Sequence, residues 1–287
     1  MTQKLLKILR FALLSPLFLA LLTNGCMRLK TSDKKILAHF EEQGVAASVQ
    51  KMAHDANELR YVETGAERNK ENLLVFVHGA PGAGDDFFGF LTDSVLLEKA
   101  RIVTVDRPGY GHSGYGKSVT SIQEQAIIIG KVLEEAKEDH IYLIGHSYGG
   151  PIVGKMATMY AVDGIMMLAP VNDPESEPIY WIAHLGKWKL TRWMASKPLR
   201  VATDEKFAHK AELALLKEDW GKITVPVVHL HGGKDFLAPF EGNVAWSKKY
   251  IKPKMLKLVE DPEMTHFIPW KNYGLVKKEL LLLMEGE

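Results

Sequence analysis

Hydrophobic and polar positions follow two periods along the chain, and the change from one to the other predicts strands separated by helices. Six short apolar runs have the length of strands, and nearly continuous hydrophobicity is typical of strands buried on both faces. They lie at residues 72–79, 101–109, 140–147, 162–170, 225–233 and 254–261. Residues 58–65 (ELRYVETG) alternate with a period of two instead, which predicts a half-buried strand.

Between these runs, apolar residues recur at three- and four-residue spacing, which is the period of an amphipathic helix. Residues 121–138 (SIQEQAIIIGKVLEEAKE) show it most clearly. Further helices are expected at residues 85–100, 148–161, 240–251 and about 268–284. Strand therefore alternates with helix, which indicates an α/β fold whose central sheet is mostly parallel and covered by helices on both faces.

Residues 171–222 interrupt this alternation, because they contain no convincing buried strand. They are helical in tendency and carry four of the six tryptophans of the chain, Trp181, Trp188, Trp193 and Trp220. We interpret this segment as a helical lid inserted over the carboxyl edge of the sheet, and a plain run of surface helices is the alternative. Residues 45–170 and 223–287 are then the two parts of the α/β core.

Composition and charge exclude some classes of function. The chain has 287 residues, with 36 Lys and Arg against 35 Asp and Glu, so its formal net charge is +1. This balance gives no reason to expect nucleic acid or a strongly anionic partner. Cys26 is the single cysteine, so a disulfide within the chain is impossible.

The N-terminus has the layout of a targeting segment. Basic residues precede an apolar stretch from Phe11 to Leu22, and small or polar residues follow it. We therefore expect residues 1–25 to be a signal peptide or an anchor that stands outside the fold. Residues 27–44, rich in Lys and Glu, are expected to be a tether.

Cys26 follows this stretch directly, and the arrangement resembles the signal of a bacterial lipoprotein, in which the cysteine carries the lipid. The resemblance implies a membrane-associated protein of the bacterial cell envelope. Thr23 and Asn24 depart from the aliphatic and small residues that the lipoprotein pattern favours before the cysteine. An ordinary cleaved signal, giving a periplasmic or secreted protein, and an uncleaved membrane anchor are the alternatives.

Residues 145–149 (GHSYG) directly follow the apolar run IYLI. The pattern G-x-S-x-G can form a sharp strand-to-helix turn that exposes the oxygen of Ser147 as a nucleophile. Glycine and serine are also common turn residues, so the pattern needs partners elsewhere in the chain.

An activated serine needs a base, and the base needs an acid that orients it. GHSYG resembles the nucleophile turn of α/β hydrolases, and that resemblance implies that the partners follow the serine in the order acid, then histidine. Asp235 lies on the loop after a strand (HGGKDFLAP), and His266 is the only histidine after it. Asp173 and Asp261 remain alternatives to Asp235 as the acid.

An oxyanion intermediate also needs preorganised N–H donors. One is expected from the backbone of Tyr148, which follows the nucleophile at the start of a helix. The other should come from the loop HGAPG (78–82). Pro81 has no N–H, so Ala80 is the expected donor.

At this point the chain resembles the α/β-hydrolase superfamily over about residues 45–285. The landmarks HGAPG, DRPGYGHS (106–113), GHSYGG, HGGKDFLAP and the late His266 agree in order and spacing. The resemblance implies a nucleophile, acid and base at Ser147, Asp235 and His266. Thr265 stands before the base, where relatives often have glycine.

The resemblance implies a serine hydrolase that cleaves small to medium carboxylic esters through an acyl-enzyme, without metal or organic cofactor. Lactonase, thioesterase or iminopeptidase activity is the alternative among enzymes, and a lipid-tethered binding protein is the alternative from another class. His146, His229 and His231 are interpreted as structural histidines, since no third residue at suitable spacing makes the last two a metal site. The sequence does not indicate an oligomeric state.

Overall fold

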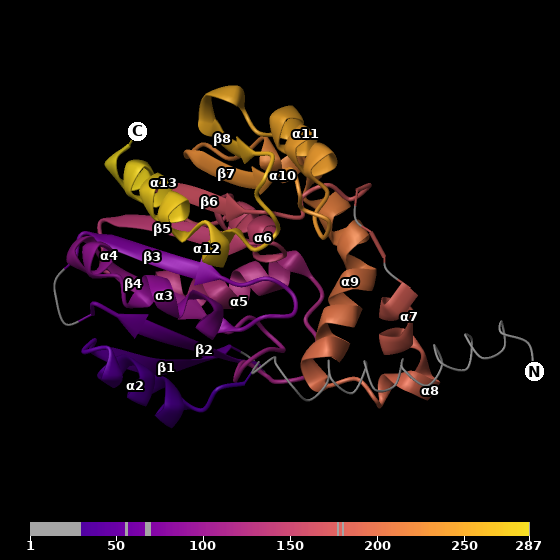
Figure 1. Cartoon of the computed structure of the whole chain (residues 1–287), viewed down its shortest axis with the longest axis horizontal. Helices are drawn as coiled ribbons and strands as arrows, with labels where there is room; N and C mark the ends of the chain where they lie inside the picture. The colour runs from indigo at the N-terminus through magenta and orange to yellow at the C-terminus, as the bar shows by residue number, and fades with distance from the viewer. Residues whose placement is uncertain (1–29, 55–56, 67–69, 177, 180, 287) are drawn as a thin grey trace, which may run out of the picture.

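The structure is a computed structural model and describes residues 30–286, except 55–56, 67–69, 177 and 180. The strands of this part form one eight-stranded sheet in the order β1-β2-β4-β3-β5-β6-β7-β8. They are β1 (Ala47–His54), β2 (Asn57–Thr64), β3 (Asn72–Val77), β4 (Ala100–Val105), β5 (His140–His146), β6 (Gly164–Leu168), β7 (Val227–Gly232) and β8 (Leu256–Asp261). Figure 1 shows the sheet in the middle of the fold.

The sheet is mostly parallel, and the expected α/β fold class is confirmed. Strands β3 to β8 pair in parallel, whereas β1 and β2 form an antiparallel hairpin and β2 pairs antiparallel with β4. All seven predicted strands are present with shifts of a few residues at their ends. The apolar pattern does not predict strand β1, because its sequence (ASVQKMAH) has no continuous apolar run and Lys51 interrupts the face that carries Ala47, Val49 and Ala53.

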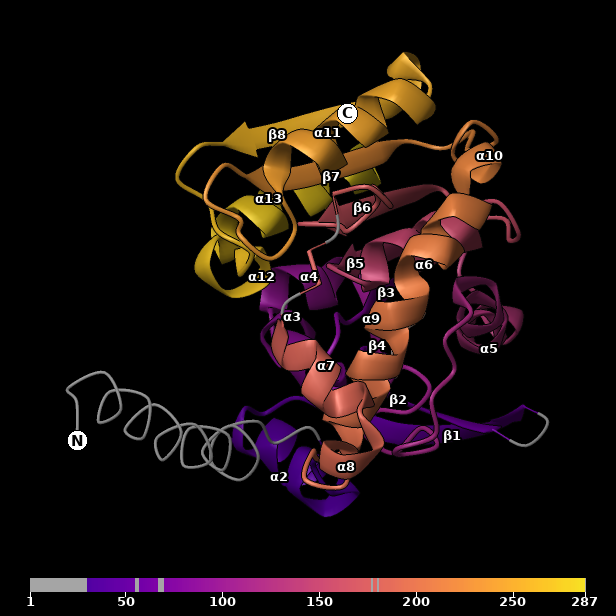
Figure 2. The same ribbon diagram turned by 90° about the vertical axis from the view of Figure 1, so that its right-hand side faces the viewer.

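Helices cover both faces of the sheet (Figures 1 and 2). One apolar cluster joins one face of the strands to α5 and α6, and the other joins the opposite face to α2, α3, α4, α12 and α13. Outside the segment between β6 and β7, the helices are α2 (Asp33–Glu42), η1 (Gly84–Phe87), α3 (Phe88–Leu91), α4 (Ser94–Lys99), α5 (Ile122–Glu134), α6 (Gly149–Met156), α11 (Phe240–Tyr250), η2 (Pro253–Met255), α12 (Ile268–Lys271) and α13 (Tyr273–Glu285).

Two predicted segments differ from the structure. Residues 27–44 are not simply a tether, because α2 occupies most of them and its Ile36 and Phe40 are buried against the sheet. The helix predicted at 85–100 is divided into η1, α3 and α4. The division has a local cause, since the carboxylate of Asp93 accepts the backbone N–H groups of Val95 and Leu96 and so caps a new helix.

Residues 171–222 connect β6 to β7, and their regular structure, where described, consists of helices, in agreement with the predicted helical tendency. They hold α7 (Trp181–Lys187), α8 (Lys189–Arg192), α9 (Lys197–Leu215) and α10 (Lys217–Trp220). We call them the helical insert. In both views α9 runs along one side of the sheet, with α8 at its lower end (Figures 1 and 2). Among the described residues, no helix is both long and apolar enough to cross a bilayer, and residues 1–25 and Cys26 lie outside them.

Candidate active site

The turn after β5 carries Ser147 in a left-handed backbone conformation, with φ of 53°. The flanking glycines make this turn possible. A Cβ atom at Gly145 would lie 2.3 Å from the carbonyl oxygen of Gly149, and one at Gly149 would lie 2.2 Å from the carbonyl oxygen of Val77. Side chains at these two positions would therefore clash with backbone, which explains in physical terms why serine is framed by glycines here.

Asp235 and His266 form a hydrogen-bonded pair at the carboxyl edge of the sheet. The distance from Nδ1 of His266 to Oδ2 of Asp235 is 2.8 Å. A carboxylate can only accept, so Nδ1 carries the proton and Nε2 is the nitrogen that can receive one. The backbone N–H groups of Leu237 and Ala238 donate to the other carboxylate oxygen, at 2.9 and 2.8 Å, and hold the acid in place.

The two alternative acids are engaged elsewhere. The carboxylate of Asp173 accepts hydrogen bonds from the hydroxyl of Ser176 and from the backbone of Glu175. Asp261 accepts the backbone N–H of Glu263 at 2.8 Å. Of the three candidates, Asp235 is the one that the structure places against His266.

His146 joins the nucleophile turn to the loop of the base. Its Nε2 lies 2.9 Å from the carbonyl oxygen of His266, to which it must donate, and the two imidazole rings are 4.9 Å apart. Burial, together with the neighbouring His266, lowers the pKa of His146 to about 3. The side chain is thus neutral and bonded to backbone, which fits the structural role predicted for it. Because Ser147 is the next residue, this bond brings Ser147 and His266 to the same site.

The loop after β3 passes directly beside the nucleophile, since a Cβ atom at Gly79 would lie 3.0 Å from Cβ of Ser147. The carbonyl oxygen of Gly79 accepts from Nδ1 of His78 at 2.7 Å and from the guanidinium of Arg107 at 3.0 Å. In a planar trans peptide the N–H points away from the carbonyl oxygen. These two donors therefore also fix the direction of the N–H of Ala80.

Arg107 is held by a fully buried ion pair with Glu205 of α9, at 2.7 Å. Glu205 also accepts from the hydroxyl of Tyr110 and the amide of Gln125. The guanidinium lies 4.6 Å from the ring centroid of Tyr148, the residue after the nucleophile. The helical insert is thus connected through Glu205 and Arg107 to both residues expected to supply oxyanion donors.

His209 of α9 strengthens this connection. Its ring stacks on that of Tyr148 with centroids 4.2 Å apart. Sequence reasoning missed both Glu205 and His209. The signal available was their spacing, because Val201, Glu205 and His209 are four residues apart and share the buried side of one helix.

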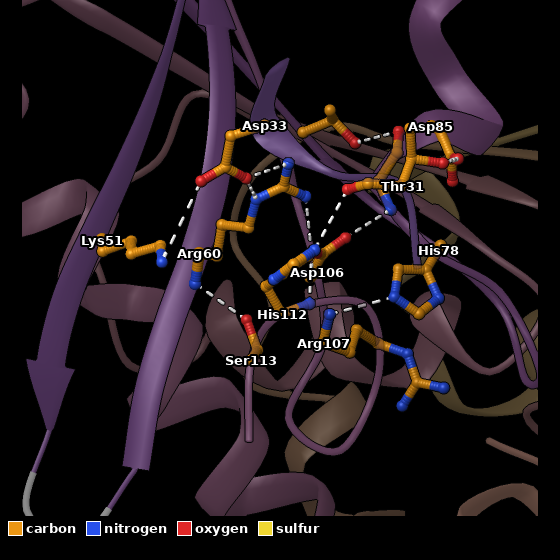
Figure 3. A network of polar contacts seen from close by, with 12 residues as sticks. Thr31, Asp33, Lys51, Arg60, His78, Asp85, Asp106, Arg107, His112 and Ser113 are labelled. Atoms are coloured by element: carbon orange, nitrogen blue, oxygen red, sulfur yellow. Dashed lines mark hydrogen bonds and ion pairs between the residues drawn. The ribbon is translucent and has the colours of Figure 1, made fainter. Parts of the chain in front are cut away.

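Asp106, the first residue of DRPGYGHS, organises the turn after β4 (Figure 3). One carboxylate oxygen accepts the N–H of Gly84 at 2.9 Å. The other accepts from Arg60 and from the N–H of His112, both at 2.8 Å. Asp106 therefore connects β2 to the loop that follows Ala80 and holds this loop in place.

A family model described as alpha/beta hydrolase fold matches residues 72–194. This match covers less than half of the chain, and the fold of the chain agrees with it. Its sheet, with an antiparallel hairpin at one edge and helices on both faces, has the α/β-hydrolase fold.

Curated relatives and solved structures of α/β hydrolases resemble this chain at low identity. It is 22% identical over 52% of its length to protein phosphatase methylesterase 1 of Candida albicans, and 25% identical over 53% to a proline iminopeptidase of Lactobacillus helveticus. The matches cover 43% and 50% of those proteins, so the chain spans at most half of their lengths. The structure of a membrane phospholipase A, described as a bacterial virulence factor, superposes with a TM-score of 0.63 at 18% identity, covering 100% of this chain and 99% of that one.

His229 and His231 form a directed chain of hydrogen bonds next to the loop of Asp235. Nε2 of His231 lies 2.8 Å from the carbonyl oxygen of Ala238, so it must donate. Nδ1 of His231 then accepts from Nε2 of His229, whose Nδ1 accepts from the hydroxyl of Ser247, each at 3.0 Å. The chain fixes the loop whose backbone holds Asp235, so both histidines have the structural role predicted for them.

Proposed function

We propose that the chain is a serine hydrolase that cleaves carboxylic esters through an acyl-enzyme. The hydrogen bond between Asp235 and His266, at the edge where Ser147 leaves β5 in a left-handed turn, carries this proposal. A nucleophile, an oriented base and an acid at one sheet edge are the arrangement that acyl transfer requires.

In the proposed reaction, Nε2 of His266 takes the hydroxyl proton of Ser147 as its oxygen attacks the ester carbonyl. Asp235 holds the imidazole in the required tautomer and stabilises the imidazolium. The backbone N–H groups of Ala80 and Tyr148 receive the oxyanion. His266 then protonates the leaving alcohol. Water hydrolyses the acyl-enzyme, with His266 again acting as base.

The preferred substrate is proposed to be an ester with an apolar acyl or alcohol part, with the helical insert acting as a lid over the site. The insert contacts the site through Glu205 and His209, and it carries exposed tryptophans at Trp188 and Trp193. A methylesterase and a phospholipase A among the similar proteins support an ester. We also propose the bacterial cell envelope as the location, with Cys26 as the lipid-bearing residue; absence of lipid label from a Cys26→Ser variant, with label on the wild type, is the expected result.

The test is hydrolysis of p-nitrophenyl esters from acetate to palmitate, run beside labelling with a fluorophosphonate, which reacts quickly only with an activated serine. Ser147→Ala should abolish labelling and lower turnover by at least about a thousandfold. Ser94→Ala, an exposed serine on α4, is the matched control and should change neither. Turnover of no ester with labelling retained would favour lactonase, thioesterase or peptidase activity. Absence of both reactions in the wild type would favour the binding protein.

A further inference from the structure

Four large apolar side chains are exposed within seven residues of the helical insert. Their exposed fractions are 58% for Trp188, 68% for Leu190, 71% for Trp193 and 42% for Met194. They lie on α8 and its two ends, and we call them the α8 patch. Single exposed apolar residues are ordinary on a protein surface, but a cluster with two tryptophans marks a surface that binds something.

The charged residues in the sequence around the α8 patch are basic. Residues 178–203 contain no Asp or Glu, although the whole chain is nearly balanced. Their basic residues are Lys187, Lys189, Arg192, Lys197 and Arg200. Arg192 is paired with Asp204, whereas the side chains of the three lysines are exposed. Segments that lie in the interface of an anionic bilayer typically combine tryptophan and leucine with exposed lysines, and the α8 patch has this composition.

The first residue that the structure describes, Lys30, lies close to the α8 patch. The ammonium groups of Lys30 and Lys197 lie 4.7 and 5.5 Å from the centroid of the same ring, that of Tyr115. Lys197 is three residues after Met194. Only residues 27–29 separate Cys26 from Lys30, and α2 begins shortly afterwards, at Asp33. Four residue steps span at most about 14 Å, so a lipid or anchor at this point would hold the α8 patch close to a membrane.

We propose that the α8 patch, with Lys187, Lys189 and Lys197, is a docking surface for an anionic lipid bilayer. The tryptophans would enter the headgroup region while the lysines contact acidic headgroups. The α8 patch lies at one end of α9, whose His209 stacks on Tyr148 and whose Glu205 pairs with Arg107 beside the loop of Ala80, so docking would place the bilayer beside the helix that borders the site. The inference concerns binding and does not depend on the proposed hydrolysis.

The test uses the full chain with vesicles of phosphatidylglycerol and phosphatidylcholine whose acyl chains carry bromine, which quenches nearby tryptophan fluorescence. The wild type should be quenched on binding. Trp188→Phe combined with Trp193→Phe should lose more than about half of the quenched signal. Trp270→Phe, which removes a tryptophan 44% exposed on another part of the surface, should lose much less. Ser147→Ala should be quenched like the wild type, which separates docking from catalysis.

Charge reversal tests the anionic partner. Lys187→Glu with Lys189→Glu should lower the quenching at least about fivefold on anionic vesicles, since each lysine at a membrane surface contributes to binding. Lys252→Glu with Lys254→Glu, exposed lysines beside β8, is the control and should have little effect. Vesicle-bound protein with equal quenching in the wild type and the double Phe variant would overturn the proposal. So would a dimer that shields Trp188 and Trp193 without lipid, because the α8 patch would then contact a second copy.

Discussion

At the scale of residues, the site combines groups that a motif reveals with groups that only the fold brings together. Ser147 and His266 lie on short loops with recognisable patterns, so the sequence alone predicts them. Glu205 has no such pattern, because its partner Arg107 is 98 residues away in the chain and the pair forms only when α9 packs on the sheet. Long-range polar contacts of this kind are the part of the site that sequence reasoning misses.

Glu205→Gln tests whether this pair positions the oxyanion loop. The variant removes a buried charge and leaves Arg107 unpaired, so Gly79 loses a firmly held donor and the N–H of Ala80 loses its fixed direction. We expect kcat for an ester to fall about tenfold or more with a smaller change in KM, since a displaced oxyanion donor weakens the transition state most.

Glu212→Gln is the control on the same helix. Glu212 accepts the N–H of Ile122, away from the oxyanion loop, and its loss should leave kcat nearly unchanged. Equal loss of kcat in both variants would show that any disturbance of α9 has this effect, and that Glu205 has no positioning role of its own.

At the scale of elements, the apolar period predicts the buried strands well and the edges of the fold poorly. Strands β3, β5 and β6 have interiors of continuous hydrophobic residues, which leave few other interpretations. The segment of α2 (DKKILAHFEE) is charged and short, and its two core residues are too few to show a period. The sequence of this segment is therefore typical of a tether. In the structure, however, Ile36 and Phe40 complete the apolar cluster on one face of the sheet.

Phe40→Ala measures how far α2 belongs to the fold. Phe40 is fully buried, and its ring centroid lies 4.8 Å from that of Phe88, so its truncation should lower the free energy of unfolding by about 3–5 kcal/mol. Leu37→Ala on the exposed side of the same helix should cost less than about 1 kcal/mol. Equal midpoints for both variants in urea denaturation would mean that α2 adds nothing to the core and behaves as a tether.

At the scale of the whole molecule, buried neutral histidines hold strands and loops together at the carboxyl side of the sheet. His78, His146, His229 and His231 each bond to a backbone or side-chain partner in the neutral form. Burial is the largest cause that lowers the pKa of each of them below the ordinary value of 6.5. The fold therefore depends on four imidazoles that must stay unprotonated.

Acid should destabilise the protein for this reason. Below about pH 6.5 the unfolded chain binds a proton at each of these histidines and the folded chain does not, so the free energy of unfolding falls as the pH falls. His78, His146 and His229, whose pKa is lowered most, should each contribute a loss of about 1 kcal/mol between pH 7 and pH 5.5. Asp85 and Asp86 act in the opposite direction, because burial raises the pKa of both, that of Asp86 to about 7.

Urea denaturation at the two pH values isolates the contribution of one histidine. His229→Gln should lower stability at pH 7, since it breaks the chain to Ser247 and His231, yet its further loss at pH 5.5 should be about 1 kcal/mol smaller than that of the wild type. His140→Gln is the opposite case. Asp163 raises the pKa of this exposed histidine, so its removal cannot reduce the loss in acid. Equal losses in the His229 variant and the wild type would mean that His229 is protonated in the folded state.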